Sequence, residues 1–572
     1  MICEKKIAKR RIEADVLVIG GGLAGLMAAI RAKAFVPRVV LVDKAKVSKS
    51  GCSPFAAGIY NAVFPEDDPD LWMREVIESG DFLADQEWVK LQAEIGFTVV
   101  KLMDEWSQQS GLPIFEKDDQ GTFQRRKSRG HVHSSHCIIN ALPMMEVMRR
   151  KAAAEGVQII ERVMITELLM ADGTALGAAG FNCRTGQIMQ LLARTVILAA
   201  GGCSFKSIFV GHKNLTGDVQ AAALRAGAVF KSMEQANSNT CYRGFDIHGM
   251  NLMVNVGGRF LNGQDEEFMW RYNPKLGNRA LLPELVLAFC HEVKEGRGPI
   301  YLDVTSAKPE DRQLCRKILP GTFRAWDRSG IDPFQTKVEW VPAFGGTRGT
   351  SGGVEVDTQT HTSIANVFAA GDTSAVAPAS AGLGGIPLAY ASVSGYRAGE
   401  AAGQLAAASP DVSRDVPGWE ELASRFISPI LKTKGILPDK FIHDLQSRLF
   451  PYDVCYLKTR PRLVKALAEL NELKHKVSEL WAPDIHQLVK ANEAMNMVLI
   501  AEVFLRSSLF REESRSYHFR EDYPLQDNKN WLKWVIVKME DSQFKLTARD
   551  IPTPYCRPTE EYSRPKGIRV AN

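Results

Sequence analysis

A glycine-rich segment near the N-terminus, Ala14–Lys44, limits the possible folds more than any other part of the chain. Its pattern predicts a strand, a sharp turn, a helix and a second strand. Gly20, Gly22 and Gly25 have the spacing G-x-G-x-x-G, and Asp43 follows Gly25 by 18 residues. Such a unit holds a pyrophosphate at the turn and a ribose on the acid, so we predict a dinucleotide site. An ordinary glycine-rich turn is the alternative, and the acid at that distance argues against it.

Composition excludes several classes of partner and location. The chain has 572 residues and a net charge of +5, which is small for this length and does not predict a nucleic-acid partner. No uninterrupted apolar run approaches the ~20 residues that cross a bilayer. The N-terminus is basic and lacks the apolar core of a signal peptide. We therefore predict no transmembrane segment and a cytoplasmic location.

The 10 cysteines are scattered, and no two form a C-x-x-C pair. This spacing argues against an iron–sulfur or zinc site within the chain, and such cysteines are mostly buried thiols. His131, His133 and His136 form the text HVHSSH, which also raises a metal hypothesis. We favour a helix-entry or pocket role for His136 and predict no metal.

An ordered set of motifs resembles the flavoprotein subunits of succinate dehydrogenase and fumarate reductase, whose relatives include L-aspartate oxidase and the adenylylsulfate reductase α subunit. The set covers most of the chain: GGGLAGLMAAIRA, SGCSPFAAGIYNA, TVILAAGG, LTGDVQAAALRAGA, VFAAGD, GLGGIPL and, near the C-terminus, REESRSYHFREDYP. The resemblance implies FAD and an α/β fold. In this fold a Rossmann-like FAD-binding domain carries an inserted α+β capping domain and is followed by a C-terminal helical domain.

The change of pattern along the chain suggests where these domains lie. Short runs alternate with loops between about Phe230 and Pro342, residues 420–510 have helical periodicity, and prolines interrupt the last thirty residues. We predict an FAD-binding domain at 1–230 and 343–408, a capping domain at 231–342, a helical domain at 417–540 and an extended tail at 541–572. The tail either wraps a partner or lies over its own domain.

The resemblance also assigns residues to the cofactor. Gly20, Gly22 and Gly25 would hold the FAD pyrophosphate, Asp43 the adenosine ribose and Asp372 the ribityl chain. The text Thr216-Gly217-Asp218 would lie near FAD, although it can also act only as a helix N-cap. The alternative for Asp372 is that it is only a turn residue at the end of a strand. The further implied contacts are Leu23, Ala24, Lys44, Ser50, Gly51, Ala57, Gly58, Val163, Ala200, Gly201, Gly371, Ile386 and Leu388.

The attachment site for covalent FAD differs from that of several succinate enzymes. Those enzymes use the histidine of a Ser-His-Thr text, and this chain has Ser50-Gly51-Cys52-Ser53. We therefore predict non-covalent FAD and interpret Cys52 as a packed thiol.

The substrate positions of the family also differ. Asn239, Val254 and Gly382 stand where the succinate and fumarate enzymes have a histidine and two arginines, and Arg348 replaces a second histidine. We predict an anionic substrate other than succinate, and the residues do not separate C–C from sulfur chemistry. A succinate or fumarate enzyme with an altered pocket and a flavoprotein that only relays electrons are the alternatives.

Four residues are the candidates for catalysis: Arg348, Asn239, His136 and Arg243. Arg348 lies between two glycine pairs, and its guanidinium could clamp a carboxylate, a sulfo group or a phosphate. Arg243 and His248 follow Asn239 in the approach to the cap, where each by itself is more typical of a solvated loop.

Electrons have to enter or leave the flavin from outside the chain. The sequence has no second glycine fingerprint for NAD(P)H and no cysteine set for an iron–sulfur centre. The chain is therefore predicted to exchange electrons with an outside partner, which the resemblance implies is an iron–sulfur electron-transfer subunit. The resemblance also allows a peripheral place on a membrane complex.

Overall fold

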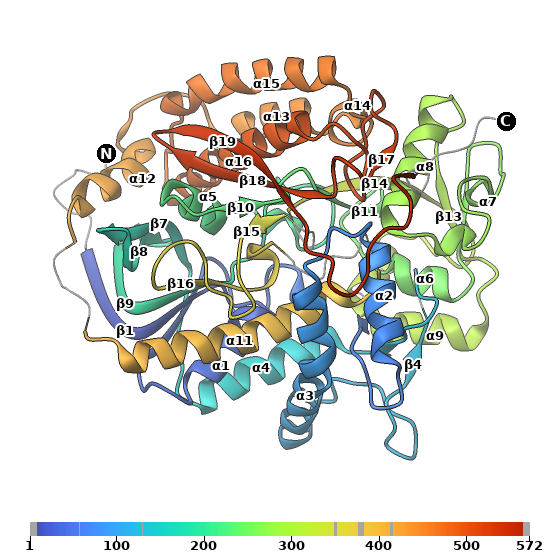
Figure 1. Cartoon of the computed structure of the whole chain (residues 1–572), viewed down its shortest axis with the longest axis horizontal. Coiled ribbons are helices and arrows are strands. Elements are labelled where there is room, and N and C mark those ends of the chain that lie inside the picture. Colours follow the sequence, from blue (N-terminus) through green and yellow to red (C-terminus); the bar gives the residue numbers. More distant parts are fainter. Residues whose placement is uncertain are drawn as a thin grey trace.

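The computed structural model describes residues 9–56, 58–127, 130–347, 352–375, 383–411 and 416–563 (Figure 1). At its centre is a seven-stranded sheet of order β6-β2-β1-β9-β8-β7, with β16 also paired to β9. β1, β2, β6, β9 and β16 pair in parallel, and β7 and β8 form an antiparallel extension. The strands are β1 (Lys9–Ile19), β2 (Val39–Asp43), β6 (Gln158–Glu161), β7 (Val163–Ala171), β8 (Thr174–Asn182), β9 (Ile188–Leu198) and β16 (Val367–Ala369).

Apolar runs explain why these central strands are buried. Val16–Ile19 in β1 and Val196–Leu198 in β9 are almost inaccessible to solvent, as continuous apolar strands covered on both faces should be. The helices α1 (Leu23–Ala32), α4 (Ala141–Ala154) and α11 (Ile386–Ala408) lie together along the sheet, and α3 (Gln86–Ser110) contacts α11 (Figure 1). Gly395 and Gly399 of α11 approach the backbone of α1 so closely that a Cβ at either position would lie 2.3 Å from a carbonyl oxygen. Glycine therefore permits the close contact between α1 and α11.

The predicted capping region forms a second sheet of order β11-β14-β13-β12 with its own hydrophobic core. Short helices surround this sheet on the right of Figure 1. Its elements are β11 (Asn237–Tyr242), β12 (Arg259–Leu261), β13 (Tyr301–Asp303), β14 (Val338–Gly346), α6 (Met250–Asn255), α7 (Met269–Tyr272), α8 (Leu282–Lys294), α9 (Pro309–Ile318) and α10 (Pro320–Ser329).

The C-terminal region is helical, as the periodicity indicates, and ends in a β-hairpin. The helices are α12 (Trp419–Leu431), α13 (Pro438–Leu449), α14 (Tyr452–Cys455), α15 (Arg460–His475) and α16 (Ile485–Phe510). The hairpin strands β18 (Lys533–Glu540) and β19 (Gln543–Asp550) pair along their whole length and join β10 (Phe230–Lys231) and β15 (Gly353–Val354) in one sheet. The hairpin spans the domain boundary that we predict at residue 541, and the domain limits remain predictions.

The other short elements connect these layers. They are α2 (Pro69–Ser79), α5 (Asp218–Arg225), β3 (Ile59–Tyr60), β4 (Arg125–Arg126), β5 (His136–Ile138), β17 (Gln526–Asp527) and β20 (Tyr562–Ser563). Within the described ranges, no helix combines the length and apolarity that spanning a bilayer would require.

Candidate functional site

In the turn between β1 and α1, close contacts with the chain's own backbone require glycine at two of the three fingerprint positions. Gly20 has φ +115°, and a Cβ there would lie 2.3 Å from the carbonyl oxygen of Ala199. A Cβ at Gly25 would lie 1.8 Å from the carbonyl oxygen of Gly20. Neither position can carry a side chain without moving backbone.

Gly22 is different, because a Cβ at this position would meet only the Ser53 hydroxyl, at 3.3 Å. Gly22 is the N-cap of α1, has φ −76° and offers no side-chain cap. Its backbone lines an open pocket at the positive end of the helix dipole. This is the space into which a pyrophosphate fits, so the turn suits the dinucleotide that the sequence predicts.

Asp43 organises the same turn. One carboxylate oxygen accepts from the Gly21 amide at 2.7 Å, and the other accepts from the Ala45 amide at 2.6 Å. Burial raises the pKa of Asp43, although both amide bonds act in the opposite direction. The carboxylate also lines the pocket, where a ribose could approach it.

A buried ion cluster joins this end of the pocket to the helical domain. The Lys44 ammonium donates to Thr216 Oγ1, Asp218 Oδ2 and Glu493 Oε1, each at 2.7 Å. Burial opposes the charge on Lys44, but Asp218 and Glu493 outweigh it and raise its pKa. The pKa of Asp218 is lowered in turn, because Lys44 outweighs the effect of burial. Asp218 is also the first residue of α5. It therefore lies at the start of a helix and beside the pocket, and the two roles that the sequence allows are compatible.

Most residues that the resemblance assigns to FAD meet in this single pocket. Those that line it are Gly20, Gly22, Leu23, Ala24, Asp43, Lys44, Ser50, Gly51, Val163, Ala200, Gly201, Thr216, Gly217, Asp218, Gly371, Asp372 and Leu388. Gly25, Gly58 and Ile386 are buried and are not among the described lining residues. Ala57 lies outside the described residues.

The same pocket continues into the cap. Asn237, Asn239 and Thr240 of β11 line it, together with His248 just before α6 and Tyr517 from the C-terminal segment. The Asn239 amide donates to Asn237 Oδ1 at 3.4 Å. His248 is buried, its Nδ1 lies 3.3 Å from Thr322 Oγ1, and burial lowers its pKa to about 4. Its imidazole is therefore neutral near pH 7.

The candidates for catalysis do not all come together. Asn239 lines the pocket. Arg243 lies on the surface, where 67% of its side chain is exposed and it pairs with Glu339 at 2.6 Å. His136 is buried on β5 beside His131, and burial lowers its pKa to about 3. Neither Arg243 nor His136 is among the described lining residues, and Arg348 lies outside the described residues.

Sequence reasoning missed several pocket residues, among them His248 and Tyr517 at the cap end. His248 was grouped with solvated loop residues because nothing local to it shows that the cap buries it. Tyr517 belongs to the family-like text REESRSYHFREDYP, and its distance of more than 270 residues from Asn239 hides their shared pocket. Among the described side chains, no group of three His, Cys, Asp or Glu residues is arranged to hold a metal ion.

Comparisons with known proteins agree with this architecture. Residues 15–388 match the family described as FAD binding domain, and residues 447–563 match the fumarate reductase flavoprotein C-terminal family. A chain of the fumarate reductase (CoM/CoB) of Methanothermobacter marburgensis is 29% identical over 92% of this chain and 98% of its own length. L-aspartate oxidase of Streptomyces coelicolor is 26% identical over 97% of this chain and 96% of its own.

A solved structure shows the same fold. The E. coli quinol fumarate reductase chain FrdA superposes with a TM-score of 0.86 and 23% identity, covering 96% of this chain and 99% of that one. The motifs and the FAD-binding family match therefore agree on the cofactor, and the superposition agrees with the architecture.

Proposed function

Since this chain belongs to the FAD-binding flavoprotein family of fumarate reductase and succinate dehydrogenase, we propose that it is the redox subunit of a larger complex and acts on an anionic substrate other than succinate. One observation carries the proposal: the pocket that begins at the glycine turn also includes Asn239 and His248 in the cap. A cofactor and a small substrate can therefore share one pocket. FAD-dependent oxidoreductase chemistry itself follows from the family.

Each part of the pocket has its own task. FAD, when bound, supplies two-electron transfer at its isoalloxazine ring. The N-terminus of α1 and the backbone at Gly22 hold the pyrophosphate, and Asp43 fixes the turn through Gly21 and Ala45. Asn239 presents an amide toward the substrate end, and the neutral His248 adds an imidazole to the same wall. Arg348 is our proposed clamp for the anionic group of the substrate.

The flavin is proposed to be non-covalent, because Ser50-Gly51-Cys52-Ser53 offers no histidine for attachment. Acid precipitation of the purified protein should release the yellow colour into the supernatant, and the supernatant should show the absorption spectrum of FAD. Colour that remains with the pellet would contradict this prediction.

Succinate and fumarate are expected to be poor substrates, because Asn239, Val254 and Gly382 stand where the resemblance places a histidine and two arginines of the succinate and fumarate enzymes. Turnover with fumarate and reduced viologen, or with succinate and an oxidising dye, should remain far below the ~1–1000 per second of ordinary enzymes. The name of the methanogen relative favours the alternative of fumarate reduction. Turnover with fumarate in the ordinary range would establish that alternative.

We propose that electrons come from an iron–sulfur protein. NADH or NADPH should therefore reduce the flavin of the isolated chain only slowly, as stopped-flow absorbance would show.

The general function is tested by reducing the flavin with dithionite and adding enoates or sulfo compounds as oxidants. Re-oxidation by at least one is expected, and re-oxidation by none would indicate a protein that only relays electrons. The cytoplasmic location remains a prediction.

A further inference from the structure

A tight turn from the C-terminal region reaches the substrate end of the pocket. Arg515 and His518 exchange two backbone hydrogen bonds, of 2.7 and 2.9 Å, so Ser516 and Tyr517 form the tip of the turn. Ser516 has φ +55°, which is uncommon for a residue with a side chain, and its amide donates to Asp81 Oδ2 at 2.8 Å. The Tyr517 amide donates to Gln235 Oε1 at 3.1 Å. These bonds fix the direction in which Tyr517 leaves the turn.

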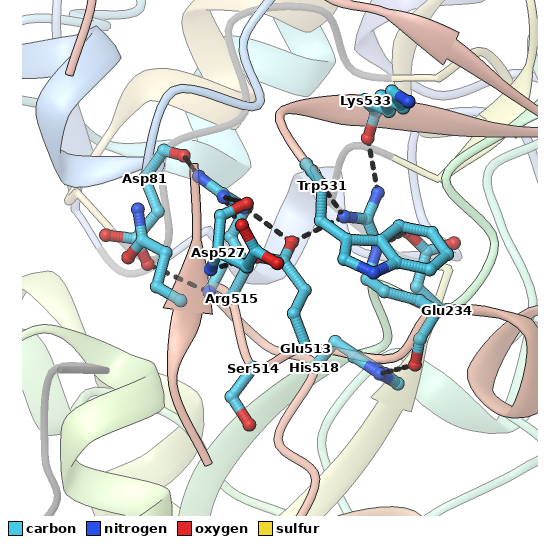
Figure 2. A network of polar contacts seen from close by, with 12 residues as sticks. Asp81, Glu234, Glu513, Ser514, Arg515, His518, Asp527, Trp531 and Lys533 are labelled. Carbon is cyan, nitrogen blue, oxygen red and sulfur yellow. Dashed lines mark hydrogen bonds and ion pairs between the residues drawn. The ribbon is translucent and has the colours of Figure 1, made fainter. Parts of the chain in front are cut away.

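A buried ion network holds the base of the turn (Figure 2). The Arg515 guanidinium donates to both carboxylate oxygens of Glu513, at 2.7 and 2.9 Å, and to the Asp81 carbonyl at 2.8 Å. Arg511 joins the same Glu513 to Glu234, which lies shortly before β11. The side chains of Arg511, Arg515, Glu234 and Glu513 have no exposed surface. Separating the partners of a buried ion pair is strongly destabilising. The turn and the residues before β11 therefore keep one arrangement relative to each other.

Tyr517 lines the pocket together with uncharged groups from the cap. The described residues that line the cap end include Asn237, Asn239, Asn251, Thr240 and His248, and among them no side chain is charged near pH 7. The charged side chains in the described lining are Asp43, Lys44, Asp218 and Asp372, all from residues assigned to FAD. The described side chains of the cap end therefore offer neutral donors and acceptors.

A second carboxylate of the substrate would lose hydration in this environment without gaining a charged partner among these side chains, which is unfavourable. An amide, ester or ketone loses less: the carbonyl of each can accept from an asparagine amide, and an amide N–H can also donate to the asparagine oxygen. We propose that Tyr517 is a specificity-determining residue that contacts a substrate with one anionic group and one uncharged polar arm. This proposal rests on the proposed function and narrows its substrate class.

Binding to the oxidised FAD-loaded protein tests the proposal without turnover. Fumarate, monomethyl fumarate and fumaramate are titrated while the flavin difference spectrum is recorded. The monoester and the monoamide should bind at least tenfold more tightly than fumarate. Tyr517→Phe should weaken both by about 3- to 10-fold, the usual worth of one hydrogen bond, with unchanged FAD content and thermal unfolding.

Tyr523→Phe is the matched control, because Tyr523 lies in the same segment with its ring 4.9 Å from the Arg520 guanidinium and is not among the described lining residues. It should leave all three affinities unchanged. Equal or tighter binding of fumarate, unaltered affinities in Tyr517→Phe, or no binding of any probe would each overturn the proposal. Failure of the proposed function would appear separately, as a reduced flavin that no oxidant can re-oxidise.

Discussion

Gly22→Val should purify as a folded protein that has lost most of its FAD. A Cβ at this position would contact only Ser53 Oγ, at 3.3 Å, and the backbone is in a region that any residue can adopt. The one close neighbour of this Cβ is a side-chain hydroxyl that has to shift by only a few tenths of an ångström, whereas a bound pyrophosphate would collide with the added side chain. Overpacking of about 1–3 kcal/mol corresponds to a roughly 5- to 150-fold loss of FAD affinity. The ratio of flavin to protein absorbance measures the loss.

Gly25→Val is the matched control within the same turn. Its Cβ would lie 1.8 Å from the Gly20 carbonyl oxygen, so the backbone itself must move. This variant should lower the thermal stability of the apoprotein, whereas Gly22→Val should leave that stability unchanged. Full flavin occupancy in Gly22→Val would show that the nucleotide does not lie on this turn.

Glu513→Gln should destabilise the C-terminal region strongly. Glu513 accepts from Arg511 at 2.6 Å, from Arg515 at 2.7 and 2.9 Å, and from the Asp527 amide at 2.8 Å. Replacing this carboxylate leaves two fully buried guanidinium groups with less compensating charge. Breaking a buried ion pair in this way costs about 3–5 kcal/mol. Urea denaturation followed by tryptophan fluorescence measures the change, and Trp531, whose ring lies 5.5 Å from the Arg511 guanidinium, is a nearby reporter.

The neighbouring residue Glu512 provides the control. Its side chain is 39% exposed and pairs with Arg460 at 3.3 Å, so Glu512→Gln should change the free energy of unfolding by less than about 1 kcal/mol. The same change of charge is made at both positions, and only burial differs. Similar denaturation midpoints for the two variants would mean that the network around Glu513 contributes little to stability.

The interpretation of the sequence was confirmed at the level of family, fold and cofactor. The glycine turn could be predicted because its geometry depends on a short βαβ unit, in which Gly20 and Gly25 meet backbone only a few residues away or in the adjacent strand. The family-like motifs were informative for the same reason, since each is a continuous stretch of chain. The assignments of individual site residues remain predictions.

Contacts between distant segments could not be predicted in this way. Arg515 donates to the Asp81 carbonyl across 434 residues, and Tyr517 reaches a pocket whose other described lining residues lie between Ile19 and Ala391. No local period or spacing encodes such a pairing, because it depends on how the C-terminal segment packs against the cap and the α2–α3 connection.

Arg243 and His248 show the difference most directly. They are five residues apart in the same loop region, and only Arg243 is a candidate for catalysis in the sequence analysis. In the structure Arg243 pairs with Glu339 at the surface, whereas His248 is buried in the pocket wall. The sequence alone determined the strand–turn–helix unit and the cofactor class, because these depend on local backbone geometry. Only the tertiary structure decided which side chains of the cap face the pocket, because that depends on the packing of segments far apart in the chain.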